Sequence, residues 1–170
     1  MRMFAGCDWI RKRHNLIITG AIGSAGKTYL ACALAHKACC EGFRVRYFRI
    51  PRLFQELAAA KVQGNYARLL RNIARVQLLV LYDWGTEVLS KQQRHDLFEA
   101  MEDRYDCASI LFAAQPPVKH WHEIIADPTL GDAILDRFMH NAYTSELKGE
   151  SMRKQKSKGL NLAPDTNHNK

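Results

Sequence analysis

The chain has 170 residues, with 25 lysine and arginine residues against 17 aspartate and glutamate residues, so its net charge is +8 when histidine is neutral. This length allows one domain, and 47% apolar residues suffice for a globular core, which excludes a disordered or collagen-like chain. No run of about 18 apolar residues and no secretory signal occurs, so we expect a cytoplasmic protein with no membrane partner. The charge favours a polyanionic partner such as nucleic acid; a merely basic surface is the alternative.

In chain order, short β-branched runs alternate with longer helical patterns, which is typical of βαβ units. This predicts an α/β domain over residues 1–147, with a five-stranded, mostly parallel sheet between two helical layers. The expected strands are Leu16–Thr19, Arg44–Phe48, Leu78–Tyr82, Ser109–Ala113 and Tyr143–Leu147. The expected helices lie near Lys27–Glu41, Arg52–Lys61, Tyr66–Arg75, Lys91–Tyr105 and Leu130–Asn141, and Gly42 is expected to end the first of them.

Residues 148–170 contain six basic residues, two acidic residues and no aromatic residue, which predicts a basic, disordered tail. The five cysteines are odd in number and include no C-x-x-C pair, so neither disulfides nor zinc is indicated. Because most of them stand in apolar helical patterns, we expect buried thiols at Cys7, Cys32, Cys39, Cys40 and Cys107.

The segment from Thr19 to Thr28 reads T-G-A-I-G-S-A-G-K-T, follows an apolar strand and opens a helix. In this context glycines let backbone N–H groups surround phosphates, Lys27 reaches the β and γ phosphates, and Thr28 ligates Mg²⁺. The candidate ATP ligands in this loop are Gly20, Gly23, Ser24, Gly26, Lys27 and Thr28. A glycine-rich turn without phosphate binding is the alternative.

The loop departs from the usual spacing G-x-x-x-x-G-K-[ST], because Ala21 stands where the first glycine belongs and Gly20 comes one residue too early. We interpret this as one extra residue, Ser24 or Ala25. Such a bulge either is absorbed at the rim of the loop or misdirects some of its N–H donors.

A second nucleotide element is expected where an apolar strand ends in acids that hold the water shell of Mg²⁺. The strand Leu78–Tyr82 is followed by Asp83, so one carboxylate stands where two are usual. Asp83 is therefore a candidate for both metal binding and catalysis. Its alternative role is to cap a turn or helix.

Together with the loop, several motifs resemble those of the IstB-like ATP-binding proteins, the helper ATPases of certain bacterial insertion sequences, which are related to helicase loaders of the AAA+ class. The motifs are Asn15–Gly20, Thr28–Leu34, Tyr66–Leu70, Asp83–Gly85, His120–Glu123, Asp127–Leu130 and Ile134–Phe138, and the similarity extends from about Cys7 to Lys154. The resemblance implies a P-loop NTPase (AAA+) core, binding of ATP and Mg²⁺, ATP-dependent assembly on double-stranded DNA, possible homo-oligomers and a transposase partner. Typical members also have an N-terminal helical domain that contacts the transposase, and this chain starts almost at the ATPase core, so we expect that domain to be missing.

The resemblance also assigns residues. Asp83 matches the second acid of the strand-end pair, and Tyr82 replaces the first. Arg137 matches the arginine that these ATPases present to the γ-phosphate of a neighbouring subunit; a surface or helix-capping arginine is the alternative. Arg153 matches a basic position near the nucleotide, and Gln115 stands where the family usually has a phosphate-sensing hydroxyl.

Departures at three nucleotide elements predict a site that binds ATP and hydrolyses it poorly or not at all. Two alternatives stay open: a non-hydrolysing basic DNA-binding or interaction remnant, and a small P-loop kinase in which Arg137 acts within its own chain. Two basic groups, Arg11–His14 and the arginines at 44, 46, 49 and 52, either face the DNA backbone or are solvated surface. Around His120, Trp121 and His122 we expect a loop or helix packed on the sheet rather than a metal site.

Overall fold

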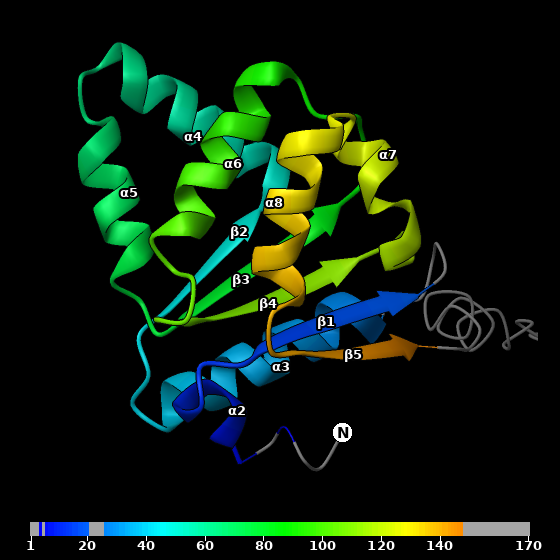
Figure 1. Ribbon diagram of the computed structural model, residues 1–170. Helices are drawn as coiled ribbons and strands as arrows, with labels where there is room; N and C mark the ends of the chain where they lie inside the picture. Colours follow the sequence, from blue (N-terminus) through cyan, green and yellow to red (C-terminus); the bar gives the residue numbers. More distant parts are fainter. Residues whose placement is uncertain (1–3, 5, 21–25, 148–170) are drawn as a thin grey trace, which may run out of the picture.

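The computed structural model describes residues 4, 6–20 and 26–147, and these residues form one sheet covered on both faces (Figure 1). The sheet order is β2-β3-β4-β1-β5, and each neighbouring pair is parallel, so the mostly parallel sheet that was expected is parallel throughout. Its strands are β1 (Asn15–Gly20), β2 (Val45–Arg49), β3 (Leu78–Trp84), β4 (Ser109–Ala114) and β5 (Ala142–Leu147).

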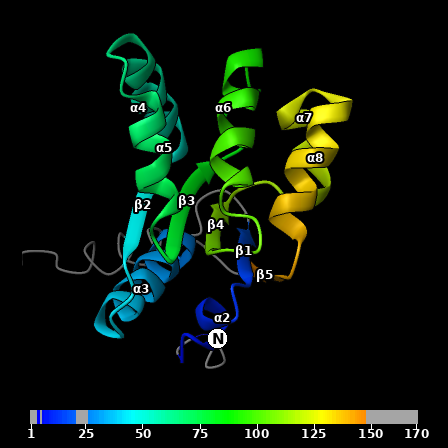
Figure 2. The same cartoon turned by 60° about the vertical axis from the view of Figure 1, so that its left-hand side comes forward.

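The helices lie in two layers, one on each face of the sheet (Figures 1 and 2). One face is covered by α2 (Asp8–Arg11) and α3 (Gly26–Cys40). The other is covered by α4 (Ile50–Val62), α5 (Tyr66–Ala74), α6 (Lys91–Glu102), the 3-10 turn η1 (Val118–His120), α7 (Trp121–Ile125) and α8 (Pro128–Met139). The predicted three-layer α/β fold is therefore confirmed.

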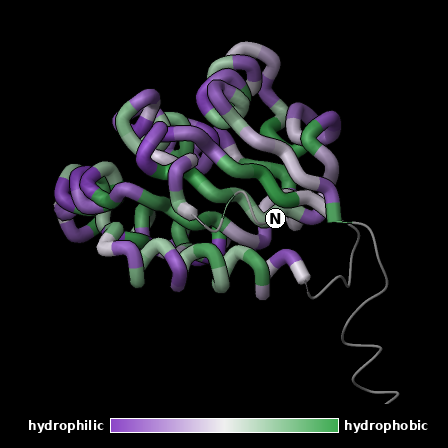
Figure 3. The backbone as a smooth tube through the Cα atoms, turned by 90° about the horizontal axis from the view of Figure 1, so that it is seen from below, coloured by the Kyte–Doolittle hydropathy of each residue, from purple (hydrophilic) through white to green (hydrophobic). Residues whose placement is uncertain are grey.

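The central or edge position of each strand in the sheet corresponds to how apolar the strand is. Every residue of β1 and β4 is buried, and the run Leu78–Leu81 of β3 is buried without alternation, as expected for strands covered on both faces. The edge strands β2 and β5 are only partly buried. Figure 3 shows the hydrophobic segments gathered in the middle of the fold and hydrophilic ones at its periphery.

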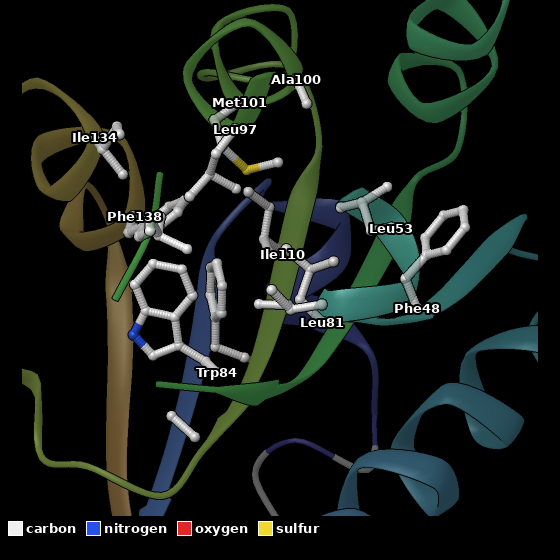
Figure 4. Close-up of a cluster of buried hydrophobic side chains, with 14 of the residues drawn as sticks. Phe48, Leu53, Leu81, Trp84, Leu97, Ala100, Met101, Ile110, Ile134 and Phe138 are labelled. Carbon is white, nitrogen blue, oxygen red and sulfur yellow. The ribbon is translucent and has the colours of Figure 1, made fainter. Parts of the chain in front are cut away.

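The larger core lies under α4 to α8 and contains a cluster of aromatic rings (Figure 4). Trp84 and Trp121 are completely buried with ring centroids 5.4 Å apart, and Phe112 and Phe138 lie 4.4 Å apart beside them. The indole Nε1 of Trp121 donates a hydrogen bond to the carbonyl of Pro116 at 3.1 Å. The expectation that this segment packs on the sheet is thus confirmed.

The expectation of buried thiols was wrong for four of the five cysteines. Cys7 is buried, whereas Cys32, Cys39, Cys40 and Cys107 are exposed. Cys107 lies in the turn before β4, and for the other three the reason is that α3 turns a single stripe toward the sheet, formed by Ala31, Leu34, Ala35 and Ala38. Its cysteines fall outside this stripe, and an apolar composition did not reveal on which side of the helix they lie.

All five predicted helices are present, with ends that differ by a few residues. Gly42 follows α3 with φ +85°, and its N–H donates to the carbonyl of Cys39, so it ends the helix as predicted. The short α2 and η1 were not predicted, because elements of three or four residues are too short to display a helical period. In the described ranges, no helix has the length and hydrophobicity needed to cross a membrane.

Candidate functional site

The carboxyl ends of the strands bring most of the predicted nucleotide ligands to one edge of the sheet. β1 ends at Gly20 and leads, through residues outside the described ranges, to the start of α3. β3 ends in the segment that contains Asp83, and Gln115 follows β4, which lies between β3 and β1. In parallel α/β sheets, ligands bind outside this edge.

Lys27 is the best defined of these residues. It is the second residue of α3, its side chain is buried, and its Nζ donates a hydrogen bond to the carbonyl oxygen of Gly20 at 2.8 Å. Burial lowers the pKa of the Lys27 ammonium from its usual value, because desolvation penalises the charged form. The ammonium therefore lies between the end of β1 and the first turn of the helix.

Gly20 has a structural reason to be glycine. It pairs with Leu147 across the β1–β5 ladder, and a Cβ built on Gly20 would stand 2.7 Å from the carbonyl oxygen of Leu147. No side chain fits that distance. This close approach accounts for a glycine one residue ahead of the usual motif position.

Of the remaining candidate ligands in this loop, the structure describes Gly26 and Thr28. Gly26 opens α3, and Thr28 is exposed in its first turn. Gly23, Ser24 and the extra loop residue lie outside the described residues, as does Arg153.

Asp83 stands at an irregularity in β3, with φ +66° and a break in the register with β4 between Tyr82 and Trp84. Its Oδ2 accepts a hydrogen bond from Nε of Arg49 at 2.7 Å, and the bond and the nearby carboxylate raise the pKa of Arg49. Arg49 is the last residue of the neighbouring strand β2. The sequence placed Arg49 either on a DNA-facing surface or on a solvated one, and neither alternative paired it with this acid.

Tyr82, which replaces the first acid of the pair, is part of an aromatic contact. Its ring stacks on Tyr47 with centroids 4.8 Å apart, on the sheet face that α3 covers. The hydroxyl of Tyr47 accepts from Sγ of Cys32 at 3.3 Å, which ties this pair to α3. A tyrosine here thus packs β2 against β3 instead of holding the water shell of a metal.

Gly85 was missed by sequence reasoning and is required by the fold. It has φ +83°, and an added Cβ would lie 2.5 Å from Cγ of Pro116 and 2.9 Å from Cδ1 of Ile124. The chain leaving β3 therefore passes directly beside the chain leaving β4. This close passage brings the segments that carry Asp83 and Gln115 together.

Arg137 lies at the opposite edge of the sheet from Lys27. The side chain of Asn15, the first residue of β1, donates to the carbonyls of Arg137 and Phe138, each at 3.2 Å. Gly20 is the last residue of that strand, so the two edges are about 16 Å apart at about 3.3 Å per residue. Arg137 is thus not placed to act on a nucleotide bound by its own Lys27, which removes the support for a kinase in which it acts within the chain.

The basic residues considered for DNA binding largely have partners inside the molecule. Arg11 pairs with Asp8 and Glu41, Arg52 pairs with Glu56, and the side chain of Arg44 donates to Gln77. These contacts favour the solvated-surface interpretation for the described part of both groups.

Comparisons with known proteins agree with this arrangement. The family model for IstB-like ATP-binding proteins matches residues 1–159. The insertion-sequence ATP-binding protein y4pL of Sinorhizobium fredii is 53% identical over 154 residues, which cover 91% of this chain and 62% of that protein. The ATP-binding protein of the insertion sequence IS21 from Pseudomonas aeruginosa is 34% identical over 167 residues, which cover 98% of this chain and 63% of that protein. The chain therefore spans less than two thirds of the length of these relatives.

Solved structures share the fold. The DnaC helicase loader matches with a TM-score of 0.70 at 24% identity, over 86% of this chain and 85% of that chain. The replication initiator DnaA bound to AMPPCP and single-stranded DNA matches with a TM-score of 0.68 at 20% identity, over 95% of this chain and 51% of that chain. The fold is thus that of AAA+ domains, and the match of sequence over nearly the whole chain shows that it belongs to the family of IstB-like ATP-binding proteins.

Proposed function

We propose that this chain binds Mg–ATP at the carboxyl edge of its sheet, hydrolyses it slowly or not at all, and acts on double-stranded DNA as a cytoplasmic helper of transposition. The position of the Lys27 ammonium, buried between the end of β1 and the start of α3, carries the proposal. Phosphate oxygens form charge-assisted hydrogen bonds with an ammonium, so a triphosphate is a favourable partner for a lysine in this position. Thr28 and Asp83 supply the oxygen ligands that suit Mg²⁺.

Thr28 and Asp83 would hold the Mg²⁺ ion, which when bound would supply positive charge that offsets the charge of the phosphates. The residues that should complete such a site for hydrolysis are altered. Tyr82 adds a stacked ring in place of a carboxylate, Asp83 is engaged by Arg49, and Gln115 offers an amide where a hydroxyl is usual. Since one well-placed donor is worth roughly 10²- to 10³-fold in rate, we expect these changes to slow turnover far more than they weaken binding.

Binding is tested with a fluorescent ATP analogue and Mg²⁺. Lys27→Ala is expected to weaken binding by about tenfold or more, the effect of losing one charged partner of a phosphate. Lys37→Ala is the matched control, because Lys37 lies on the same helix, exposed and paired with Glu41. No binding by the unchanged chain would contradict the proposal and leave the basic DNA-binding remnant in its place.

Hydrolysis is tested by phosphate release on the same samples. We expect little release from the unchanged chain and a clear gain when Tyr82→Asp is combined with deletion of Ala25, which restores the first acid of the pair and the usual loop length. Tyr82→Phe with the same deletion is the control, because it keeps a stacking ring and adds no carboxylate. Ready phosphate release by the unchanged chain would show that the altered residues do not impair the site.

We further propose that Arg137 contacts the γ-phosphate of ATP bound by a second copy of the chain. Its place at the edge opposite Lys27 supports this arrangement, because copies stacked edge to edge would bring one chain's Arg137 to the next chain's nucleotide. ATP-dependent self-association, seen by sedimentation and lost in Arg137→Ala, is the expected result. A transposase is the partner that the family resemblance implies, and a pull-down with the transposase of an insertion sequence from this family tests it.

A further inference from the structure

We infer that Glu102 is a positioning residue, which holds the Arg137 guanidinium ready for the phosphate of a nucleotide bound to a second copy of the chain. The inference rests on the proposed function, because it requires ATP at the carboxyl edge of that copy. Glu102 is the last residue of α6, and Arg137 lies in the last turns of α8, the helix that packs beside α6 (Figures 1 and 2).

Four contacts fix the guanidinium of Arg137. Its Nε donates to Oε2 of Glu102, and its Nη1 donates to the carbonyl of Ala133 one turn earlier in α8, at 2.9 Å. Its Cζ lies 4.7 Å from the centroid of the Phe98 ring and 5.7 Å from that of Tyr105. A flexible side chain is thus held in one orientation by groups from α6, from the segment that follows it and from its own helix.

These contacts leave part of the guanidinium available. Among the described residues, none accepts a hydrogen bond from Nη2, and the Arg137 side chain is 21% exposed. Because Glu102 accepts from Nε, a phosphate oxygen can approach Nη2 of the guanidinium without displacing the Glu102 carboxylate. An arginine oriented before binding loses less conformational entropy when the phosphate arrives.

The charges of Arg137 and Glu102 stabilise the ion pair between them. The hydrogen bond to Glu102 raises the pKa of Arg137, and the bond from Arg137 lowers the pKa of Glu102, so both groups stay charged at neutral pH. The carboxylate is half exposed, so water screens its repulsion toward an approaching phosphate. We therefore expect the gain from fixed orientation to exceed the cost of the nearby negative charge.

The test uses two variants of the 170-residue chain, chosen so that only one pairing of them can place an arginine at a bound nucleotide. The acceptor carries Arg137→Ala and can bind a nucleotide but offers no arginine. The donor carries Lys27→Ala and offers Arg137 but binds nucleotide more weakly, so the nucleotide concentration is set to load the acceptor and leave the donor largely empty. With fluorescent labels on both, the dissociation constant of the mixed pair is measured in Mg²⁺ and a non-hydrolysable ATP analogue, so the result does not depend on turnover.

Adding Glu102→Ala to the donor is expected to weaken the mixed pair by about five- to tenfold, because the Arg137 side chain must then be ordered when the two chains associate. Glu102→Gln in the donor is expected to recover most of the affinity, because its amide oxygen still accepts from Nε. In the acceptor, where position 137 is already alanine, Glu102→Ala should leave the affinity unchanged. Asp103→Ala in the donor is the matched control, since it removes an adjacent exposed carboxylate that makes no contact with Arg137.

The outcomes separate the inference from the proposal on which it rests. If the unaltered donor and acceptor do not associate in the presence of the analogue, the proposed Arg137 contact fails. If they associate and Glu102→Ala in the donor leaves the affinity unchanged, Glu102 does not position Arg137. A tighter pair would also overturn the inference, because it would mean that Glu102 competes with the phosphate. Equal losses from Glu102→Ala in donor and acceptor would show a general loss of structure, which thermal unfolding of each variant detects independently.

Discussion

Two glycines at the carboxyl edge of the sheet are required by close packing of the chain. At Gly20 the obstacle to a side chain is the carbonyl of Leu147, and at Gly85 it is the side chains of Pro116 and Ile124. Both contacts involve segments distant in the sequence. A glycine near this site can therefore be required by the packing of the chain as well as by phosphate binding.

Gly85→Ala is predicted to lower the free energy of unfolding by about 3 kcal/mol, because a left-handed residue gains a Cβ and that Cβ overlaps the packed core. Gly64→Ala is the control: Gly64 has φ +71° but open space around its Cα, so about 1 kcal/mol is expected from backbone strain alone. Urea unfolding of both variants measures the difference. Equal losses would mean that the contact with Pro116 is relieved by a shift of the chain.

On the scale of elements, α4, α5 and α6 are joined by polar groups around Asp96. This carboxylate is 3% exposed, accepts hydrogen bonds from Lys61 and from Gln92 Nε2, and lies 3.0 Å from the Tyr66 hydroxyl. The same hydroxyl lies 2.6 Å from Oε2 of Glu99. A buried carboxylate is stable here because three side chains from three helices satisfy it.

Tyr66→Phe is predicted to lower the free energy of unfolding by about 1 kcal/mol at neutral pH, because one hydrogen bond to a charged group is lost. Burial, followed by the bonds to Glu99 and Asp96, raises the pKa of Tyr66, so the folded state keeps the phenol proton longer than the unfolded state does. The contribution of the hydroxyl is therefore complete below about pH 10, the usual tyrosine pKa, and declines as the pH rises above it.

Denaturant titrations of Tyr66→Phe and the unchanged chain, from neutral pH to above pH 10, measure this decline. The difference between them should shrink at alkaline pH. Tyr29→Phe is the control, since Tyr29 is 75% exposed on α3 and the change should be neutral throughout. A constant difference for Tyr66→Phe at all pH values would contradict the assigned cause.

At the level of the whole molecule, the charge is unevenly distributed. Arginines in the described ranges are often paired or stacked on rings, whereas residues 148–170 contribute six basic and two acidic residues to the sequence. If DNA binding is directed at the phosphate backbone, its strength follows the number of cations that reach phosphates, and the sequence concentrates basic residues near its C-terminal end. The C-terminal residues are then the main source of affinity.

Replacing Lys154, Lys156 and Lys158 by Gln is predicted to weaken binding to duplex DNA and to reduce the slope of log affinity against log salt by up to about 3, if each lysine contacts one phosphate. The control replaces Lys12, Lys91 and Lys119, which are scattered over the described surface. Fluorescence anisotropy at several salt concentrations measures both slopes. Equal slopes for the two triple variants would mean that total charge, and not the C-terminal cluster, governs binding.

Much of this fold and part of the site were predictable from local patterns. A strand buried on both faces is recognisable from an unbroken apolar run such as Leu78–Leu81. A loop that ends in Gly26, Lys27 and Thr28 predicts a helix with a lysine in its first turn. These signals arise within a few neighbouring residues. The exposure of the α3 cysteines was not predictable, because helical periodicity alone does not say which stripe meets the sheet.

The sequence by itself determined the order of strands and helices along the chain, the family, and the positions of Lys27 at the start of a helix and Asp83 near the end of a strand, because each depends on residues close together in the chain. Only the tertiary structure decided that Arg49 engages Asp83, that Glu102 holds Arg137, and that Arg137 lies at the edge opposite Lys27. The two ion pairs join residues 34 and 35 positions apart. Such contacts depend on how the strands are ordered in the sheet and how the helices pack on it, which no local pattern encodes.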